Sequence, residues 1–218
     1  MAQEVQSGAR RPPGGTIQAG QIVRQLRAHA PFTAAGTATG VAIMLVFSYA
    51  EASRQVSELL FWGLHPLHVL LSAMVTAAMY RLNSSGGLVR TVLIGYVGSV
   101  GIATLSDSVI PFAGEWLLQL PHRGLHVGFI EKWWLVNPLA LGGIALACLW
   151  PRTRVPHAGH VLLSTWASLF HITMAAGRSL DPPAMAAAAV FLFLAVWVPC
   201  CTSDIVFPLL WVKKETRT

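Results

Sequence analysis

Long apolar segments alternate along this chain with short polar breaks. Each apolar segment approaches the roughly 20 residues that a helix needs to cross a bilayer. The breaks carry turn-forming residues, as in 83–87, 151–156 and 181–183. The pattern therefore predicts an all-α integral membrane protein with six transmembrane helices, at about 31–50, 59–81, 89–111, 133–150, 158–177 and 185–212.

The composition supports a membrane protein. Of the 218 residues, 54% are hydrophobic and 11% are charged, against roughly 25% charged in soluble domains, and the mean hydropathy is +0.58. The isoelectric point near 9.8 does not indicate a nucleic-acid partner, because the basic residues are scattered among the ends of the predicted helices. The expected partner is the lipid bilayer.

The distribution of basic residues predicts that both termini are cytoplasmic. In that orientation eleven Lys and Arg residues lie on the cytoplasmic side and four on the opposite side, as the positive-inside rule requires. The cytoplasmic set is Arg10, Arg11, Arg24, Arg27, Arg81, Arg90, Arg152, Arg154, Lys213, Lys214 and Arg217; the opposite set is Arg54, Arg123, Lys132 and Arg178.

Three short motifs occur twice, in the same order. HPLHVLLS at 65–72 returns as HAGHVLLS at 157–164, and TLSDSVIP at 104–111 returns as TSDIVFP at 202–208. A weaker match pairs His29-x-x-Phe32 with His126-x-x-Phe129. Three matches in register indicate a duplication of about 95 residues. The predicted organisation is a polar tail (1–28), a first three-helix repeat (29–120) and a second (121–218).

An odd number of helices per repeat makes the second copy enter the membrane from the opposite side. The two copies are then related by inverted topology, an arrangement found in many transporters, whose binding sites lie between the repeats. This expectation rests on architecture alone, and a fold does not by itself define a function.

The repeated histidines are candidate metal ligands. Residues at i and i+3 share a helix face, so His65 with His68, and His157 with His160, can each present two imidazoles together. Imidazole binds zinc, copper, iron and nickel. The alternative is that these are polar residues near an interface, hydrogen-bonded to backbone or water.

The S-D-x-V-x-P motif suggests a cation site. Pro111 and Pro208 lack an amide hydrogen, so in an α-helix the carbonyls of Asp107 and Asp204 lose their partner. The same residue would then offer a carboxylate and a free carbonyl. The alternative is a proline kink beside an aspartate that caps a neighbouring helix.

Topology sorts the candidate ligands into two clusters on opposite sides. The outer cluster would contain His65, His68, Asp107 and His126, and the cytoplasmic cluster His157, His160, Asp204 and His29. Possible additional members are His122, Glu131, His171, Ser106 and Ser203. The three cysteines are interpreted as small packing residues. One central site made from both clusters remains an alternative.

The favoured function is a transporter or channel for a divalent transition-metal cation; zinc, iron, nickel and manganese are not distinguished. A second possibility is an integral membrane metalloenzyme, a hydrolase or hydroxylase acting on a lipid or another membrane substrate. A third is a haem b protein with axial histidines from the second and fifth helices. The size of the chain leaves a homo-oligomer open.

Overall fold

The computed structural model describes residues 19–50, 53–84, 86–151, 154–177, 180–201 and 206–212. For 19–26, 28–29, 154–157 and 201 it describes the backbone alone. The side chains of His29 and His157, and all of Ser203 and Asp204, therefore lie outside the description, and their predicted roles stay predictions.

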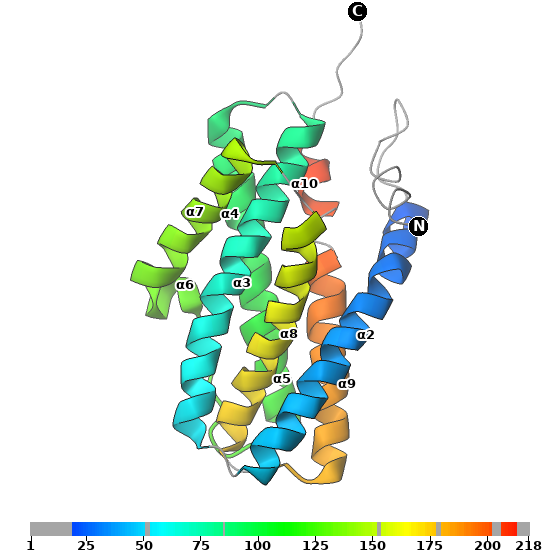
Figure 1. Cartoon of the computed structure of the whole chain (residues 1–218), viewed down its shortest axis with the longest axis vertical. Coiled ribbons are helices and arrows are strands. Elements are labelled where there is room, and N and C mark those ends of the chain that lie inside the picture. The colour runs from blue at the N-terminus through cyan, green and yellow to red at the C-terminus, as the bar shows by residue number, and fades with distance from the viewer. Residues whose placement is uncertain are drawn as a thin grey trace, which may run out of the picture.

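The described chain is all-helical, as predicted, and no strand occurs in it (Figure 1). The elements are α2 (Ala19–Tyr49), α3 (Arg54–Asn83), α4 (Leu88–Thr104), the π-helix η1 (Leu105–Val109), α5 (Ile110–Leu117), α6 (Gly128–Glu131), α7 (Trp133–Leu149), α8 (Arg154–Ala176), α9 (Pro182–Cys201) and α10 (Phe207–Leu210). Successive long helices run in opposite directions along the long axis of the bundle (Figure 1).

Four helical segments of the described chain are long and apolar enough to cross a membrane: Ala30–Tyr49, Arg54–Asn83, Leu88–Leu117 and Pro182–Cys200. This is consistent with a multi-pass membrane protein. The predicted count of six is not confirmed. α7 has only 17 residues, and α8 carries a row of polar side chains that lowers its hydropathy.

The first long helix begins before the predicted transmembrane segment. α2 starts at Ala19 and continues through Pro31 to Tyr49, and its apolar, membrane-length part, Ala30–Tyr49, matches the predicted 31–50. Backbone hydrogen bonding carries a helix past the point where the apolar residues begin, so hydropathy locates the apolar part and not the helix end.

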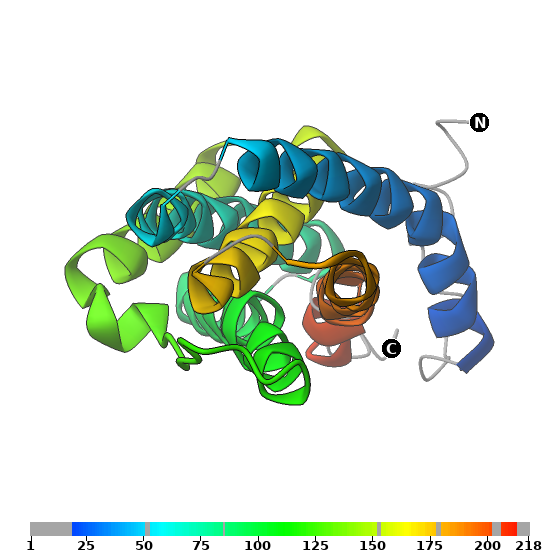
Figure 2. The same cartoon turned by 90° about the horizontal axis from the view of Figure 1, so that it is seen from below.

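α3 and α8 form the centre of the bundle. Viewed along the bundle in Figure 2, α8 lies among α2, α3, α5 and α9, and it packs against all four. On its other side α3 packs against α4 and α7. These two central helices bury polar residues at helical spacing, namely His65, His68, Ser72 and Thr76 on α3, and His160, Ser164, Ser168 and His171 on α8. The interior of the bundle is thus polar along the line where they meet.

Two neighbouring glycines on α7 offer a matched test of this packing. A Cβ at Gly143 would overlap the carbonyl oxygen of Leu70 and come within 3.0 Å of the Ala73 Cβ on α3, whereas a Cβ at Gly142 would meet nothing within 4 Å. Gly143→Ala is therefore expected to destabilise the protein by about 1–3 kcal/mol. Gly142→Ala should be neutral or stabilising by up to about 1 kcal/mol. Thermal unfolding of both variants in detergent measures the difference; equal melting temperatures would contradict the α3–α7 contact.

Candidate functional site

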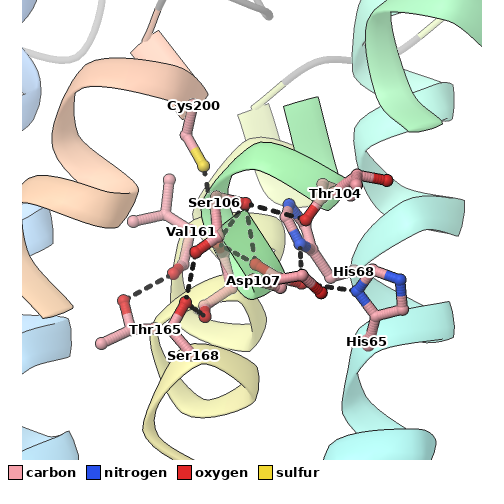
Figure 3. A network of polar contacts seen from close by, with 12 residues as sticks. His65, His68, Thr104, Ser106, Asp107, Val161, Thr165, Ser168 and Cys200 are labelled. Carbon is pink, nitrogen blue, oxygen red and sulfur yellow. Dashed lines mark hydrogen bonds and ion pairs between the residues drawn. The ribbon is translucent and has the colours of Figure 1, made fainter. Parts of the chain in front are cut away.

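Asp107 is the centre of a buried polar network between α3, η1, α8 and α9 (Figure 3). Its Oδ2 atom lies 2.9 Å from Nδ1 of His65 and 2.7 Å from Nδ1 of His68. Its Oδ1 atom accepts hydrogen bonds from the hydroxyls of Ser106 at 2.7 Å and Ser164 at 2.8 Å. One carboxylate therefore orients two imidazoles from α3 and is itself held by hydroxyls from η1 and α8.

The contacts to Asp107 fix which ring nitrogens remain available. A carboxylate oxygen accepts hydrogen bonds, so His65 and His68 donate from Nδ1, and Nε2 of each neutral ring carries the lone pair. Both Nε2 atoms are buried without a hydrogen-bond partner. A carboxylate on one imidazole nitrogen, with the other nitrogen facing the ion, is the usual arrangement around protein-bound metals.

His68 meets His160 at the centre of the bundle. Their rings are stacked, with centroids 5.4 Å apart and an interplanar angle of 10°. Cys200 of α9 joins them: one ligand atom from each of His68, His160 and Cys200 lies within 4.8 Å of the others, and all three residues are buried. Ligand atoms around a tetrahedral zinc ion would be about 3.3–3.8 Å apart. A small inward movement of these side chains would therefore bring the three ligand atoms to the spacing that a tetrahedral transition metal requires.

We refer to these seven residues as the central cluster: His65, His68, Ser106, Asp107, His160, Ser164 and Cys200. The predicted separation of His68 and His160 into clusters on opposite sides is wrong, because their rings are in contact. α3 extends over 30 residues, against the predicted 59–81, and His68 lies at its middle rather than in an outer half. Depth along a helix could not be read from hydropathy alone.

The predicted proline effect at Asp107 takes a different form. Residues 105–109 are π-helical, and the amide of Ile110 donates to the carbonyl of Leu105, five residues earlier. In this register Pro111 stands opposite the carbonyl of Ser106 rather than that of Asp107. The hydroxyl of Ser168 on α8 lies 2.9 Å from that carbonyl and 2.8 Å from the carbonyl of Ser164, and it can donate its one hydrogen to either. Isolated π-turns of this kind are frequent at functional sites.

Replacing Pro111 should separate the binding geometry from stability. Pro111→Ala restores an amide hydrogen, which lets the helix close in the α register and turns Asp107 away from the histidines. Stability is expected to stay level or rise, because an interior proline costs about 3 kcal/mol in water. Metal affinity should fall about tenfold. Chelator competition and thermal unfolding measure the two effects, with Pro138→Ala on α7 as control; unchanged affinity would show that the π-turn does not position Asp107.

A second cluster of ionisable side chains, partly buried, lies beside the central cluster. His171 of α8 is hydrogen-bonded through Nδ1 to Oε1 of Glu115 on α5, and both residues are fully buried. The ring of His126 lies 5.3 Å from that of His171, and its Nδ1 atom is 3.1 Å from Oε2 of Glu131. His126 was expected among the ligands around Asp107. Its side chain instead pairs with Glu131 and contacts His171, and the ring of Phe61 contacts His65, His126 and His171.

The structure thus brings together some predicted residues and not others. His65, His68, Ser106 and Asp107 join His160, whereas His126, Glu131 and His171 form the neighbouring group. His122 is exposed and lies beside Gly177 at the end of α8. Glu115, Ser164 and Cys200 were not among the predicted site residues. The spacing of four, four and three residues from His160 to His171 was a usable signal for α8, since it places all four polar residues on one face.

Comparison of the chain with protein-family models, with curated proteins and with solved structures gave no match. The class of protein is therefore defined from the fold and the site alone. It is an all-helical protein with several membrane-length helices and a buried histidine–carboxylate network in its interior.

Proposed function

We propose that this protein is a transporter or channel for a divalent transition-metal cation, which crosses the bundle between α3 and α8. One observation carries the proposal. Nε2 of His65, Nε2 of His68, the hydroxyl of Ser72 and the hydroxyl of Thr76 are all buried without a hydrogen-bond partner, and they follow one another along one face of α3. Unpaired polar atoms are costly inside a membrane protein, so a row of them supports a path for a polar ligand.

The chemistry of the central cluster favours a transition metal as the transported ion. Imidazole nitrogen and cysteine sulfur suit zinc and related ions, whereas magnesium and calcium prefer oxygen ligands. His68, His160 and Cys200 would hold the ion, and Asp107 would orient His68 and His65. Three protein ligands leave a fourth position open. A transported ion needs such a position to enter and leave.

We further propose that the bundle consists of two repeats of inverted topology, with both termini cytoplasmic. The packing supports this. Exchanging the two repeats maps the α3–α8 contact onto itself. It also maps the α2–α9 contact onto the α7–α4 contact, and the α3–α4 contact onto the α8–α9 contact. His68 and His160 are equivalent positions and meet face to face, as residues at a pseudo-two-fold axis would. Val206, like Val109, is π-helical, and Pro208, like Pro111, stands in the first turn of the helix that follows.

A membrane metalloenzyme is the second candidate, because an open fourth position next to the Ser164 hydroxyl also suits a metal that activates water. The haem alternative would need another pair of histidines, since the rings of His68 and His160 are stacked with centroids 5.4 Å apart and leave no gap for a porphyrin between them.

Reconstitution tests the proposal. Purified protein in sealed vesicles should take up zinc, and empty vesicles and magnesium serve as controls. Uptake that is saturable and selective for transition metals supports transport. Tight zinc binding without uptake would overturn the transport proposal and direct attention to hydrolysis of lipid esters by the zinc-loaded protein.

A further inference from the structure

The Glu115–His171 pair is an ionisable site that the central cluster does not use. Both side chains have 0% exposure. Glu115 accepts hydrogen bonds at both oxygens, from Nδ1 of His171 at Oε1 and from the amide of Gly124 at 3.2 Å at Oε2. Nε2 of His171 has no partner. Ionisable residues within membrane helices are expensive, and they commonly mark proton relays.

We propose that the Glu115–His171 pair binds the proton that is exchanged for the metal cation. The proposal rests on the transport function proposed above and names its coupling ion. With Nδ1 donating to Glu115, a proton can add at Nε2 of His171, which changes the net charge of the pair from minus one to zero. Release of that proton restores the neutral imidazole beside the carboxylate.

A route connects this pair to the surface. Glu131 and His126 have side chains that are 40% and 26% exposed, and they are paired with each other at 3.1 Å. The His126 ring lies 5.3 Å from the ring of His171, so a proton taken up by His126 has a short distance to travel. One carboxylate and one imidazole, Glu131 and His126, therefore lie between solvent and the buried pair.

The Phe61 ring contacts both this route and the central cluster. Its ring is fully buried, with its centroid 5.1 Å from that of His171 and 5.4 Å from that of His65. A phenyl ring has no group that donates or accepts a proton. The proton and the cation would thus occupy neighbouring sites without a hydrogen-bonded connection through Phe61.

Charge repulsion would couple the two sites. His160 and His171 are eleven residues apart on α8, about 16 Å along the helix axis. In an interior with little water, a cation at the central cluster disfavours a proton at the pair, and a bound proton disfavours the cation. Such coupling is reciprocal. Because each bound ion weakens binding of the other, the metal cation and the proton would be exchanged for one another.

The other titratable groups around the pair are few in the described chain. They are His122, Arg123 and His126 from the segment before α6, Glu131 of α6, and His65 and Asp107 of the central cluster. α9 also packs against α5 and contains no ionisable side chain except Cys200 and Cys201. The variants below therefore alter the pair without touching the groups of the central cluster.

The test uses vesicles that contain the full chain and a trapped pH indicator, with the membrane potential clamped. Zinc entering wild-type vesicles should drive protons out, and one pH unit of imposed gradient should change zinc accumulation about tenfold for each proton exchanged. Glu115→Gln, and His171→Asn, which keeps a donor near the Nδ1 position, should both abolish the gradient response while zinc still binds at the central cluster. Glu58→Gln, an exposed carboxylate at the start of α3, should retain the response.

The outcomes are distinct. A normal gradient response in Glu115→Gln and His171→Asn, or zinc transport without proton movement in the wild type, overturns the proton site. If the wild type takes up no zinc, transport itself fails, and NMR of isotope-labelled histidine side chains decides the rest. A titrating signal that His171→Asn removes and Glu58→Gln retains would support proton binding by the pair; absence of that signal would refute it.

Discussion

Replacing Asp107 with asparagine is expected to lower zinc affinity about 100-fold. The carboxylate orients His65 and His68 together, and loss of one such orienting partner typically costs 10–100-fold in metal affinity. Asparagine has a similar shape, but its amide nitrogen donates, so it cannot accept all four of the hydrogen bonds that Asp107 accepts. The loss should be visible both in chelator competition and in vesicle uptake.

Stability provides the control for this variant. At least one buried donor around residue 107 would be left without an acceptor, which costs about 1–3 kcal/mol. A folded Asp107→Asn protein with lowered melting temperature and lost zinc binding fits the proposed role. Glu58→Gln should change neither quantity, since that side chain is exposed. A folded Asp107→Asn variant with affinity within threefold of wild type would end the proposal that Asp107 supports a metal site.

Single replacement of His68 or His160 is expected to remove the central metal site completely. Because the two rings stack against each other, both belong to one site. His68→Ala and His160→Ala should each reduce zinc bound at this site from one equivalent to none, with affinity lowered by more than about 100-fold. The double variant should be no worse than either single variant, because residues of one site do not contribute additively.

Binding stoichiometry makes this prediction decisive. If each repeat held its own ion, either single variant would keep half of the bound zinc, and the double variant would lose the remainder. Isothermal titration with zinc, on protein of verified folding, separates the two cases. His122→Ala serves as the matched control, because this histidine is exposed and lies apart from the cluster.

Local features of the chain were predictable from sequence because their causes are local. Apolar segments of membrane length predict helices directly, since backbone groups in a bilayer must be satisfied within the segment. The duplicated motifs singled out His65, His68, Asp107 and His160 because ionisable residues are rare in such segments. Pro111 signalled an irregular helix at the right place.

The meeting of these residues depended on the tertiary structure. His68 and His160 are 92 positions apart, and only the packing of α3 against α8 brings their rings into contact. Cys200 and Glu115 fall outside the repeated motifs, so the motifs gave no reason to select them. The π-turn shifts the backbone hydrogen bonding at 105–109 by one residue, and the Ser106 carbonyl that this leaves opposite Pro111 lies next to Ser168 of α8.

The sequence by itself therefore determined that the chain is helical, where its apolar segments lie and which ionisable residues are unusual. These properties follow from hydrogen bonding and hydrophobicity along a single segment. The tertiary structure decided that His68 and His160 share a central cluster, that His126 and His171 belong with Glu115 and Glu131, and that the Phe61 ring contacts both groups. Contacts between distant helices depend on how their faces pack, and the side chains that set this packing are spread over the whole chain.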